Sequence, residues 1–87
     1  MWEINYSKNA LKQLKKMDRS NSGYIVSWIE KNLVGCENPR LFGKALVGDL
    51  QGLWRYRAGN YRMLAKLEDE QCIILFVDIG HRKDIYK

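Results

Sequence analysis

The alternation of apolar and polar residues at the start of the chain predicts one strand followed by a helix. Residues 1–6 (MWEINY) alternate roughly as a half-buried strand does. Ser7 comes next, and serine is a favoured N-cap because its hydroxyl accepts a hydrogen bond from the first helical turn. An apolar stripe at helical spacing follows, made of Ala10, Leu11, Leu14 and Met17. Residues 18–23 (DRSNSG) are predicted to break this helix.

A second helix is predicted from about residue 22 to residue 34. One side of it carries Ile25, Trp28, Ile29, Asn32 and Leu33. Gly35 is a typical residue just past a helix end, and Pro39 cannot continue a helix. Residues 37–52 are then expected to form a loop-rich connection.

The rest of the chain predicts strands joined by short turns. Gly59 and Asn60 suit a two-residue hairpin turn, because both residues tolerate positive φ. Residues 68–71 (EDEQ) make the next turn, and residues 72–80 (CIILFVDIG) are predicted to form a strand buried on both sides for much of its length. Residues 81–87 form a basic tail with room for one more short strand. The order β-α-α-β-β-β predicts an α+β fold, with two N-terminal helices packed on one face of a small antiparallel sheet.

Length and composition narrow the class of protein. A chain of 87 residues is expected to form a single domain, 1–87. The 15 Lys and Arg outnumber the 10 Asp and Glu, and the net charge of +5 favours a polyanionic partner such as RNA, DNA or an acidic protein. The two cysteines form no CxxC pair, which argues against a zinc site. The longest apolar run is too short for a membrane span, so we expect a cytoplasmic protein with no membrane partner.

The predicted hairpin sorts its side chains onto two faces. Residues 52–62 (GLWRYRAGNYR) hold its first strand and turn, and side chains alternate along a strand, so Arg55 and Arg57 share a face. With the turn at Gly59 and Asn60, Arg57 lies opposite Arg62. The cationic face then comprises Arg55, Arg57, Arg62 and Lys66, together with Leu64. The face toward the helices comprises Trp54, Tyr56, Tyr61, Met63, Ala65 and Leu67.

Two interpretations of the cationic face are open at this point. Like charges directly opposite each other destabilise a sheet, so a face without local counterions favours a phosphate-rich ligand. The alternative is a solvated edge, or arginines that pair with distant acids such as Asp49 or Asp78.

Two further side chains near the C-terminus are candidates for chemistry. His81 is the only histidine, and a single histidine is more often structural than catalytic. The ordinary histidine pKa of about 6.5 nevertheless suits proton transfer near neutral pH. Tyr86 can stack on a base, donate a hydrogen bond or anchor the C-terminus. The sequence has no P-loop, HExxH motif or Ser/Cys triad signature.

Two stretches resemble the RelE/ParE superfamily of bacterial toxins, and its RelE branch more closely than ParE. They are residues 43–70 (GKALVGDLQGLWRYRAGNYRMLAKLEDE) and residues 74–86 (ILFVDIGHRKDIY), and the LKQLKK of residues 11–16 also fits. The resemblance implies a toxin of a type II toxin-antitoxin system. RelE-like toxins are endoribonucleases that cut mRNA in the ribosomal A site and need no metal or organic cofactor. A cognate antitoxin, RelB-like or of another type, holds the toxin inactive and supplies the contacts with operator DNA.

The resemblance also implies which residues act. The family's basic hairpin positions fall at Arg55, Arg57 and Arg62, its arginine after the last long strand at Arg82, and its C-terminal tyrosine at Tyr86. Some members carry lysine at the first two of these positions. Arginine effectively cannot lose its proton, which argues against a base role for Arg55 and Arg57 here.

The mechanism expected on this basis is attack of the 2′-hydroxyl on the adjacent phosphate, without a metal. Fixed guanidiniums stabilise the charge of the phosphorane, and we expect Arg62 and Arg82 to contact the scissile phosphate. The residues expected to hold flanking phosphates are Arg55, Arg57, Lys66 and Lys83. His81 or Tyr86 would transfer protons, and His81 is the better match by ordinary pKa.

Two alternative functions share this fold or charge pattern. One is a ParE-like toxin that binds DNA gyrase and cleaves nothing, and the other is a non-catalytic nucleic-acid-binding module. The set of His81, Arg82 and Tyr86 argues against a pure gyrase binder, which needs no proton-transfer group beside arginines.

Overall fold

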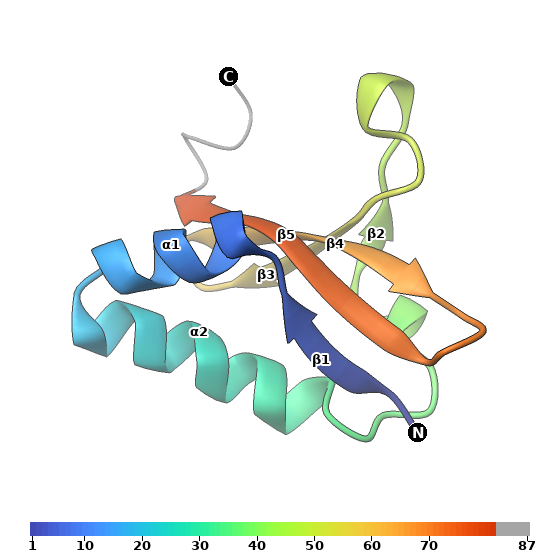
Figure 1. The fold of residues 1–87 in the computed structure, drawn as a ribbon, viewed down its shortest axis with the longest axis horizontal. Coiled ribbons are helices and arrows are strands. Elements are labelled where there is room, and N and C mark those ends of the chain that lie inside the picture. The colour runs from blue at the N-terminus through green and yellow to red at the C-terminus, as the bar shows by residue number, and fades with distance from the viewer. Residues whose placement is uncertain (82–87) are drawn as a thin grey trace.

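A five-stranded sheet with two helices on one face forms the protein (Figure 1). The computed structural model describes residues 1–81. The helices are α1 (Lys8–Lys16) and α2 (Arg19–Asn32), and two short 3-10 helices are η1 (Pro39–Phe42) and η2 (Gly48–Leu50). The strands are β1 (Glu3–Tyr6), β2 (Lys44–Ala45), β3 (Trp54–Ala58), β4 (Tyr61–Glu68) and β5 (Ile73–His81), in the spatial order β1-β5-β4-β3-β2. The predicted α+β class is confirmed.

The sheet is mixed, which corrects the expected antiparallel sheet. Strands β2, β3, β4 and β5 pair antiparallel, whereas β1 runs parallel to β5, with Glu3 opposite Ile73. A parallel pair needs a long crossover connection, and the two helices and the hairpin between β1 and β5 provide one. The connection predicted as a loop also holds the short strand β2, which pairs with the start of β3.

The two helices are separated by a shorter break than the sequence indicates. Ser7 caps α1 as predicted, with its Oγ accepting from the Ala10 backbone N–H at 3.0 Å. The predicted breaker 18–23 is mostly helical, because α2 begins at Arg19 and its first turn bonds to the Asp18 carbonyl. Burial of Ile25 and Ile29 outweighs the weak helix propensity of the serines and glycine before them.

A β-bulge in β5 sets which of its side chains face the core. Leu64 pairs with Asp78 but Ala65 pairs with Phe76, so Val77 is the extra residue. Phe76 and Ile79 are three residues apart and both lie in the core, which a regular strand would not allow. The α1 helix satisfies the backbone around the bulge. Asn9 Nδ2 donates to the Val77 carbonyl at 3.0 Å, and Gln13 accepts from the Ile79 N–H while donating to the Asp78 carboxylate.

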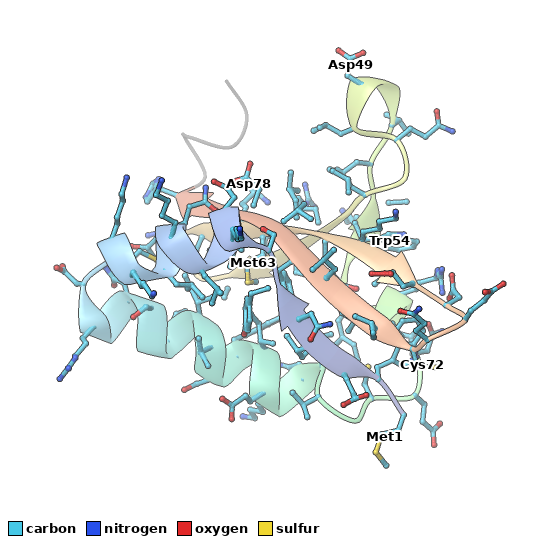
Figure 2. The ribbon with its side chains drawn as sticks, in the orientation of Figure 1. Met1, Asp49, Trp54, Met63, Cys72 and Asp78 are labelled. Carbon is cyan, nitrogen blue, oxygen red and sulfur yellow. The ribbon has the colours of Figure 1, made fainter. Side chains whose placement is uncertain are left out.

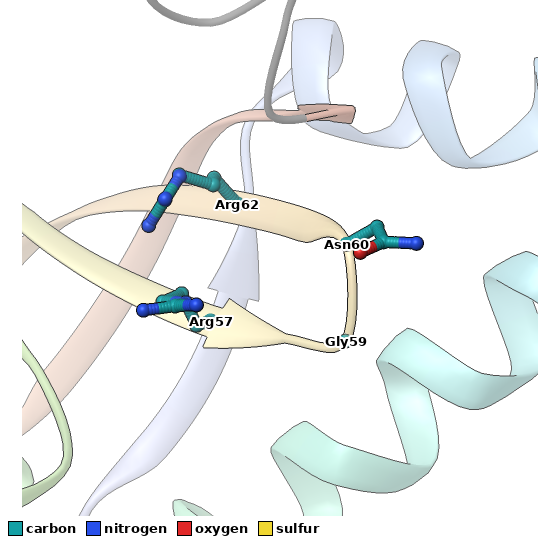
Figure 3. A pocket seen from close by; sticks show the side chains of 4 residues that line it. All are labelled: Arg57, Gly59, Asn60 and Arg62. Atoms are coloured by element: carbon teal, nitrogen blue, oxygen red, sulfur yellow. The ribbon is translucent and has the colours of Figure 1, made fainter.

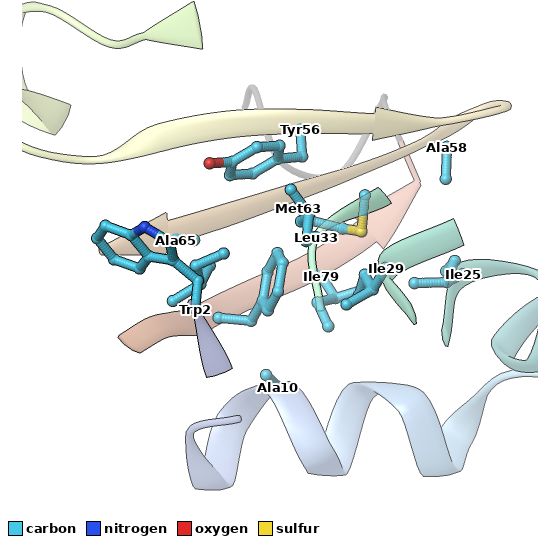
Figure 4. Packing of buried hydrophobic residues seen from close by; sticks show 12 residues of the cluster. Trp2, Ala10, Ile25, Ile29, Leu33, Tyr56, Ala58, Met63, Ala65 and Ile79 are labelled. Atoms are coloured by element: carbon cyan, nitrogen blue, oxygen red, sulfur yellow. The ribbon is translucent and has the colours of Figure 1, made fainter. Parts of the chain in front are cut away.

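The core lies between the helices and the sheet (Figure 4). Its fully buried large side chains include Ile25, Ile29 and Leu33 on the helical side and Tyr56, Met63, Ile74, Phe76 and Ile79 on the sheet. Leu11, predicted for the apolar stripe of α1, is 43% exposed. Burial raises the pKa of Tyr56 far above its usual range, and the hydroxyl donates to the Pro39 carbonyl at 2.9 Å. This bond ties η1 to β3.

Gly43 and Gly23 form a matched pair for testing how η1 is seated. A Cβ at Gly43 would lie 2.8 Å from the Arg55 carbonyl oxygen and 2.8 Å from Cε1 of Tyr56. Gly43→Ala should therefore lower the free energy of unfolding by about 1–3 kcal/mol. Gly23 lies within α2 with open space around it, so Gly23→Ala should raise that free energy by about 0.5–1 kcal/mol. Urea unfolding measures both, and an unchanged Gly43→Ala protein would mean that η1 does not pack this closely on β3.

Candidate nucleic-acid interface

The hairpin of β3 and β4 adopts the predicted register. Arg57 lies opposite Arg62, and Tyr56 lies opposite Met63 on the core side. The side of the sheet away from the helices therefore carries Arg55, Arg57 and Arg62, which we call the arginine face. Leu64, which was predicted to lie on this face beside the cations, is almost fully buried.

Strand pairing extends this arginine face across the sheet. Lys44 on β2 lies opposite Arg55, a neighbour that sequence reasoning missed because β2 is only two residues long. On the other side of the hairpin, Gly80 of β5 lies opposite Arg62. Since Gly80 has no side chain, β5 adds no bulk beside the Arg62 side chain.

Arg57 and Arg62 project together from neighbouring strands (Figure 3). With Gly59 and Asn60 they line a small pocket of about 20 Å³, enough for one group the size of a water molecule. Arg62 is only 8% exposed, so its position is held by its surroundings, whereas Arg57 is exposed. A phosphate oxygen has the size and charge to enter such a pocket.

The predicted acidic partners do not neutralise Arg55 or Arg57. Within residues 1–81 neither arginine forms an ion pair, and Asp78 accepts instead from Gln13 at 2.6 Å. Asp49 lies on η2, at the tip of a segment that projects away from the sheet (Figure 2). In the same described range, the buried Nε of Arg55 has no hydrogen-bond acceptor. These observations favour a bound anion over internal charge pairing.

The other predicted site residues have different positions. His81 pairs with Tyr61 at the end of β5, and the two rings lie edge to face at 5.7 Å. The pairing register puts His81 on the side of Tyr61, opposite to that of Arg62. Lys66 is exposed on the same side as Arg62, about 13 Å further along β4. Arg82, Lys83 and Tyr86 lie outside the described residues.

The η1 segment beside the arginine face is joined to the turn after β4 by an ion pair that the sequence did not reveal. Arg40 donates two hydrogen bonds of 2.9 Å to the Asp69 carboxylate, and its guanidinium lies 5.4 Å from the centre of the Trp54 ring. These hydrogen bonds hold the pKa of Asp69 below its usual range. In the described part of the chain, no three His, Cys, Asp or Glu side chains gather to hold a metal ion, and no helix is long and apolar enough to cross a membrane.

Many solved structures share this fold, and two of them illustrate the likeness. The toxin–antitoxin complex RelBE2 from Mycobacterium tuberculosis contains a chain that is 23% identical, with 93% of this chain and 98% of that chain covered and a TM-score of 0.81. The isolated RelE toxin of E. coli is 16% identical over 99% of this chain and 92% of that chain, with a TM-score of 0.71. The architecture is thus that of RelE-like toxins.

The sequence comparisons extend the likeness from fold to family. The family model for the ParE toxin of the type II toxin-antitoxin system parDE matches residues 4–86, so the chain belongs to this toxin family within the RelE/ParE superfamily. A relative at 27% identity is Toxin RelG of Mycobacterium tuberculosis, aligned over 86 residues that cover 99% of this chain and 97% of the relative. The predicted superfamily is confirmed.

The Arg40–Asp69 pair predicts a pH dependence of stability. The pKa of Asp69 is lower in the folded chain, so its contribution is present above the ordinary Asp pKa of about 3.9 and is lost as pH falls through the folded value. Wild type should be more stable than Asp69→Asn at pH 7, and the difference should vanish in acid. Urea unfolding at a series of pH values measures it, with Glu70→Gln in the same turn as a control. A difference that persists well below pH 3 would show that the ion pair is not its source.

Proposed function

We propose that this toxin is an endoribonuclease that cleaves mRNA in the ribosomal A site. The observation that carries the proposal is the pair of arginines opposite each other on β3 and β4, around a pocket of phosphate-oxygen size. Two guanidiniums that face each other at one register position can both reach a phosphate in the pocket between them. Such charge-assisted hydrogen bonds to phosphate are among the stronger ones in proteins.

The proposed reaction uses a nucleophile from the substrate itself. The 2′-hydroxyl oxygen attacks the neighbouring phosphorus, the bond from phosphorus to the 5′-oxygen breaks, and a 2′,3′-cyclic phosphate and a 5′-hydroxyl are formed. The 2′-hydroxyl gives up a proton and the leaving 5′-oxygen takes one, so the reaction is balanced without a metal ion. The phosphorane between these steps carries two negative charges, which fixed guanidiniums stabilise.

Arg62 is our choice for the scissile phosphate, together with Arg82. Arg62 is buried on a central strand, and a guanidinium that is already in place needs little reorganisation when charge develops. The residues proposed to hold flanking phosphates are Arg55, Arg57, Lys66 and Lys83. Proton transfer is assigned to His81 or Tyr86 on the resemblance and on side-chain chemistry. This assignment does not rest on strand geometry, because the register puts His81 on the side of Tyr61, opposite to that of Arg62. The ribosome would orient the message, which makes the isolated toxin a slow nuclease.

The proposal includes partners. We infer that a RelB-like antitoxin neutralises the toxin, because a solved structure with this fold is a toxin–antitoxin complex and the arginine face attracts carboxylates. Operator DNA would be contacted only through that antitoxin, and mRNA on the ribosome in the cytoplasm would be the substrate.

Inhibition of DNA gyrase is the second candidate function. The family model that matches the chain is named for ParE, and this observation favours it. A gyrase inhibitor would use the same fold as a binding surface and would leave mRNA intact.

The first test is substitution of Arg62. Arg62→Ala should relieve growth arrest in a bacterial host and slow single-turnover cleavage by about 10²–10³-fold, the usual loss when one charge-stabilising donor is removed. Arg62→Lys keeps the charge but not the planar fork and should recover only part of the rate. Arg19→Ala, an exposed arginine at the start of α2, is the matched control and should behave as wild type. Full toxicity of a folded Arg62→Ala protein would remove Arg62 from the site.

The second test changes a single atom of the substrate. A ribosomal complex is programmed with a message that carries one 2′-deoxy nucleotide just before the cut site. Binding depends mainly on phosphates and should survive, whereas cleavage at that bond should cease and other bonds remain competent. Single-turnover cleavage, followed by mapping of 5′ ends, measures this. If the modified bond is still cut, the nucleophile is water or a side chain.

The same preparation separates the two candidate functions. An intact message combined with inhibited supercoiling by DNA gyrase would establish the ParE-like function. A cut message with gyrase unaffected would establish the nuclease.

A further inference from the structure

A second pocket adjoins the arginine face, between η1, β2 and β3. It is lined by Leu41, Phe42, Gly43, Lys44, Arg55 and Arg57 and has a volume of about 250 Å³. Three of these described lining residues are cationic and none of them is acidic. Arg57 also lines the small arginine pocket, so the two pockets share a wall.

Two large apolar side chains are exposed at this cationic pocket. Leu41 is 78% exposed and Phe42 is 42% exposed. Single exposed apolar residues are common on protein surfaces, but a neighbouring pair that lines one pocket with three cations points to a ligand with both apolar and anionic parts.

The segment that carries Leu41 and Phe42 is joined to its neighbours on both sides. On one side the Tyr56 hydroxyl binds the Pro39 carbonyl, and Arg40 is held by Asp69. On the other side Gly43 lies so close to β3 that no Cβ would fit. A side chain presented from a segment fixed at both ends loses little conformational freedom on binding a ligand.

The opposite wall of the pocket supplies donors for an anion. Lys44 and Arg55 lie directly opposite each other on β2 and β3. Both residues line the pocket, and cationic side chains that face one space can donate hydrogen bonds to one anion. An aromatic ring beside paired cations suits a nucleotide, whose base stacks and whose phosphate accepts hydrogen bonds.

We propose that this pocket is a nucleotide subsite for single-stranded RNA, in which Phe42 stacks on an unpaired base while Lys44 and Arg55 bind a phosphate. The inference rests on the proposed function for its choice of RNA. Adjacent strands lie about 5 Å apart, so β2 and β4 are separated by about 10 Å, and one short stretch of RNA can reach both pockets. The excess of cations over acids favours RNA over an apolar protein segment as the occupant.

The test measures binding without cleavage. The probe is the ribosomal complex whose message carries the 2′-deoxy nucleotide at the cut site, and the proteins are wild type, Phe42→Leu and Phe42→Trp. Phe42→Leu keeps apolar bulk but cannot stack, and it should weaken binding by about 5- to 100-fold. Phe42→Trp keeps the stacking surface and should bind within about threefold of wild type. Val47→Ser is the control, because Val47 is 84% exposed but is not among the pocket-lining residues.

A second modification identifies the base that Phe42 contacts. Replacing one message position at a time by an abasic nucleotide should weaken wild-type binding strongly at one position near the cut site. The same replacement should have little further effect on Phe42→Leu, because the two changes remove one contact. Lys44→Gln should lower the salt dependence of binding, reducing its log–log slope by about 0.7, as expected for one lost phosphate contact on a single strand.

The outcomes separate this inference from the function on which it rests. If wild type binds and cleaves the message but folded Phe42→Leu binds equally well, the subsite is overturned and the nuclease stands. Additive effects of Phe42→Leu and every abasic position would also overturn it, because Phe42 would then act without touching a base. If wild type does not bind the message at all, both proposals are wrong.

Discussion

The two-residue turn at Gly59 and Asn60 fixes the register of β3 against β4, and most of the molecule depends on that register. Side chains alternate with a period of two, so a slip of β3 by one residue would move Tyr56 out of the core and turn Arg55 and Arg57 toward the helices. Gly59 has a φ of +61°, which a residue with a Cβ rarely adopts. The conformation of this one glycine therefore helps to set which side chains of the hairpin face the core and which lie on the arginine face.

The features that sequence reasoning predicted correctly are local ones. The Ser7 cap, the buried stripe of α2 and the pairing of Arg57 with Arg62 each depend on residues a few positions apart. For such features the spacing of residue types determines the geometry directly. The arginine face could therefore be predicted, because it needs only alternation and a turn.

The features that were missed depend on contacts between distant parts of the chain. The parallel pairing of β1 with β5, the bulge at Val77 and the strand β2 each depend on a partner that local pattern does not identify. Lys44 was overlooked for this reason, since two residues show no periodicity. The position of His81 depends on the same bulge, because one extra residue exchanges the faces of every side chain after it. A candidate site read from strand alternation is therefore reliable only up to the first bulge.

The pairing of β1 with β5 has a consequence for when the chain can fold during its synthesis. The first strand of the chain completes its hydrogen bonds only with the last described strand, and α1 lies against the bulge in that same strand. A growing polypeptide that lacks β5 leaves the edges of β1 and β4 unpaired and α1 without the strand that it packs on. It also lacks Ile74, Phe76 and Ile79, so its core is incomplete. The chain therefore completes its structure only when nearly the whole message has been read.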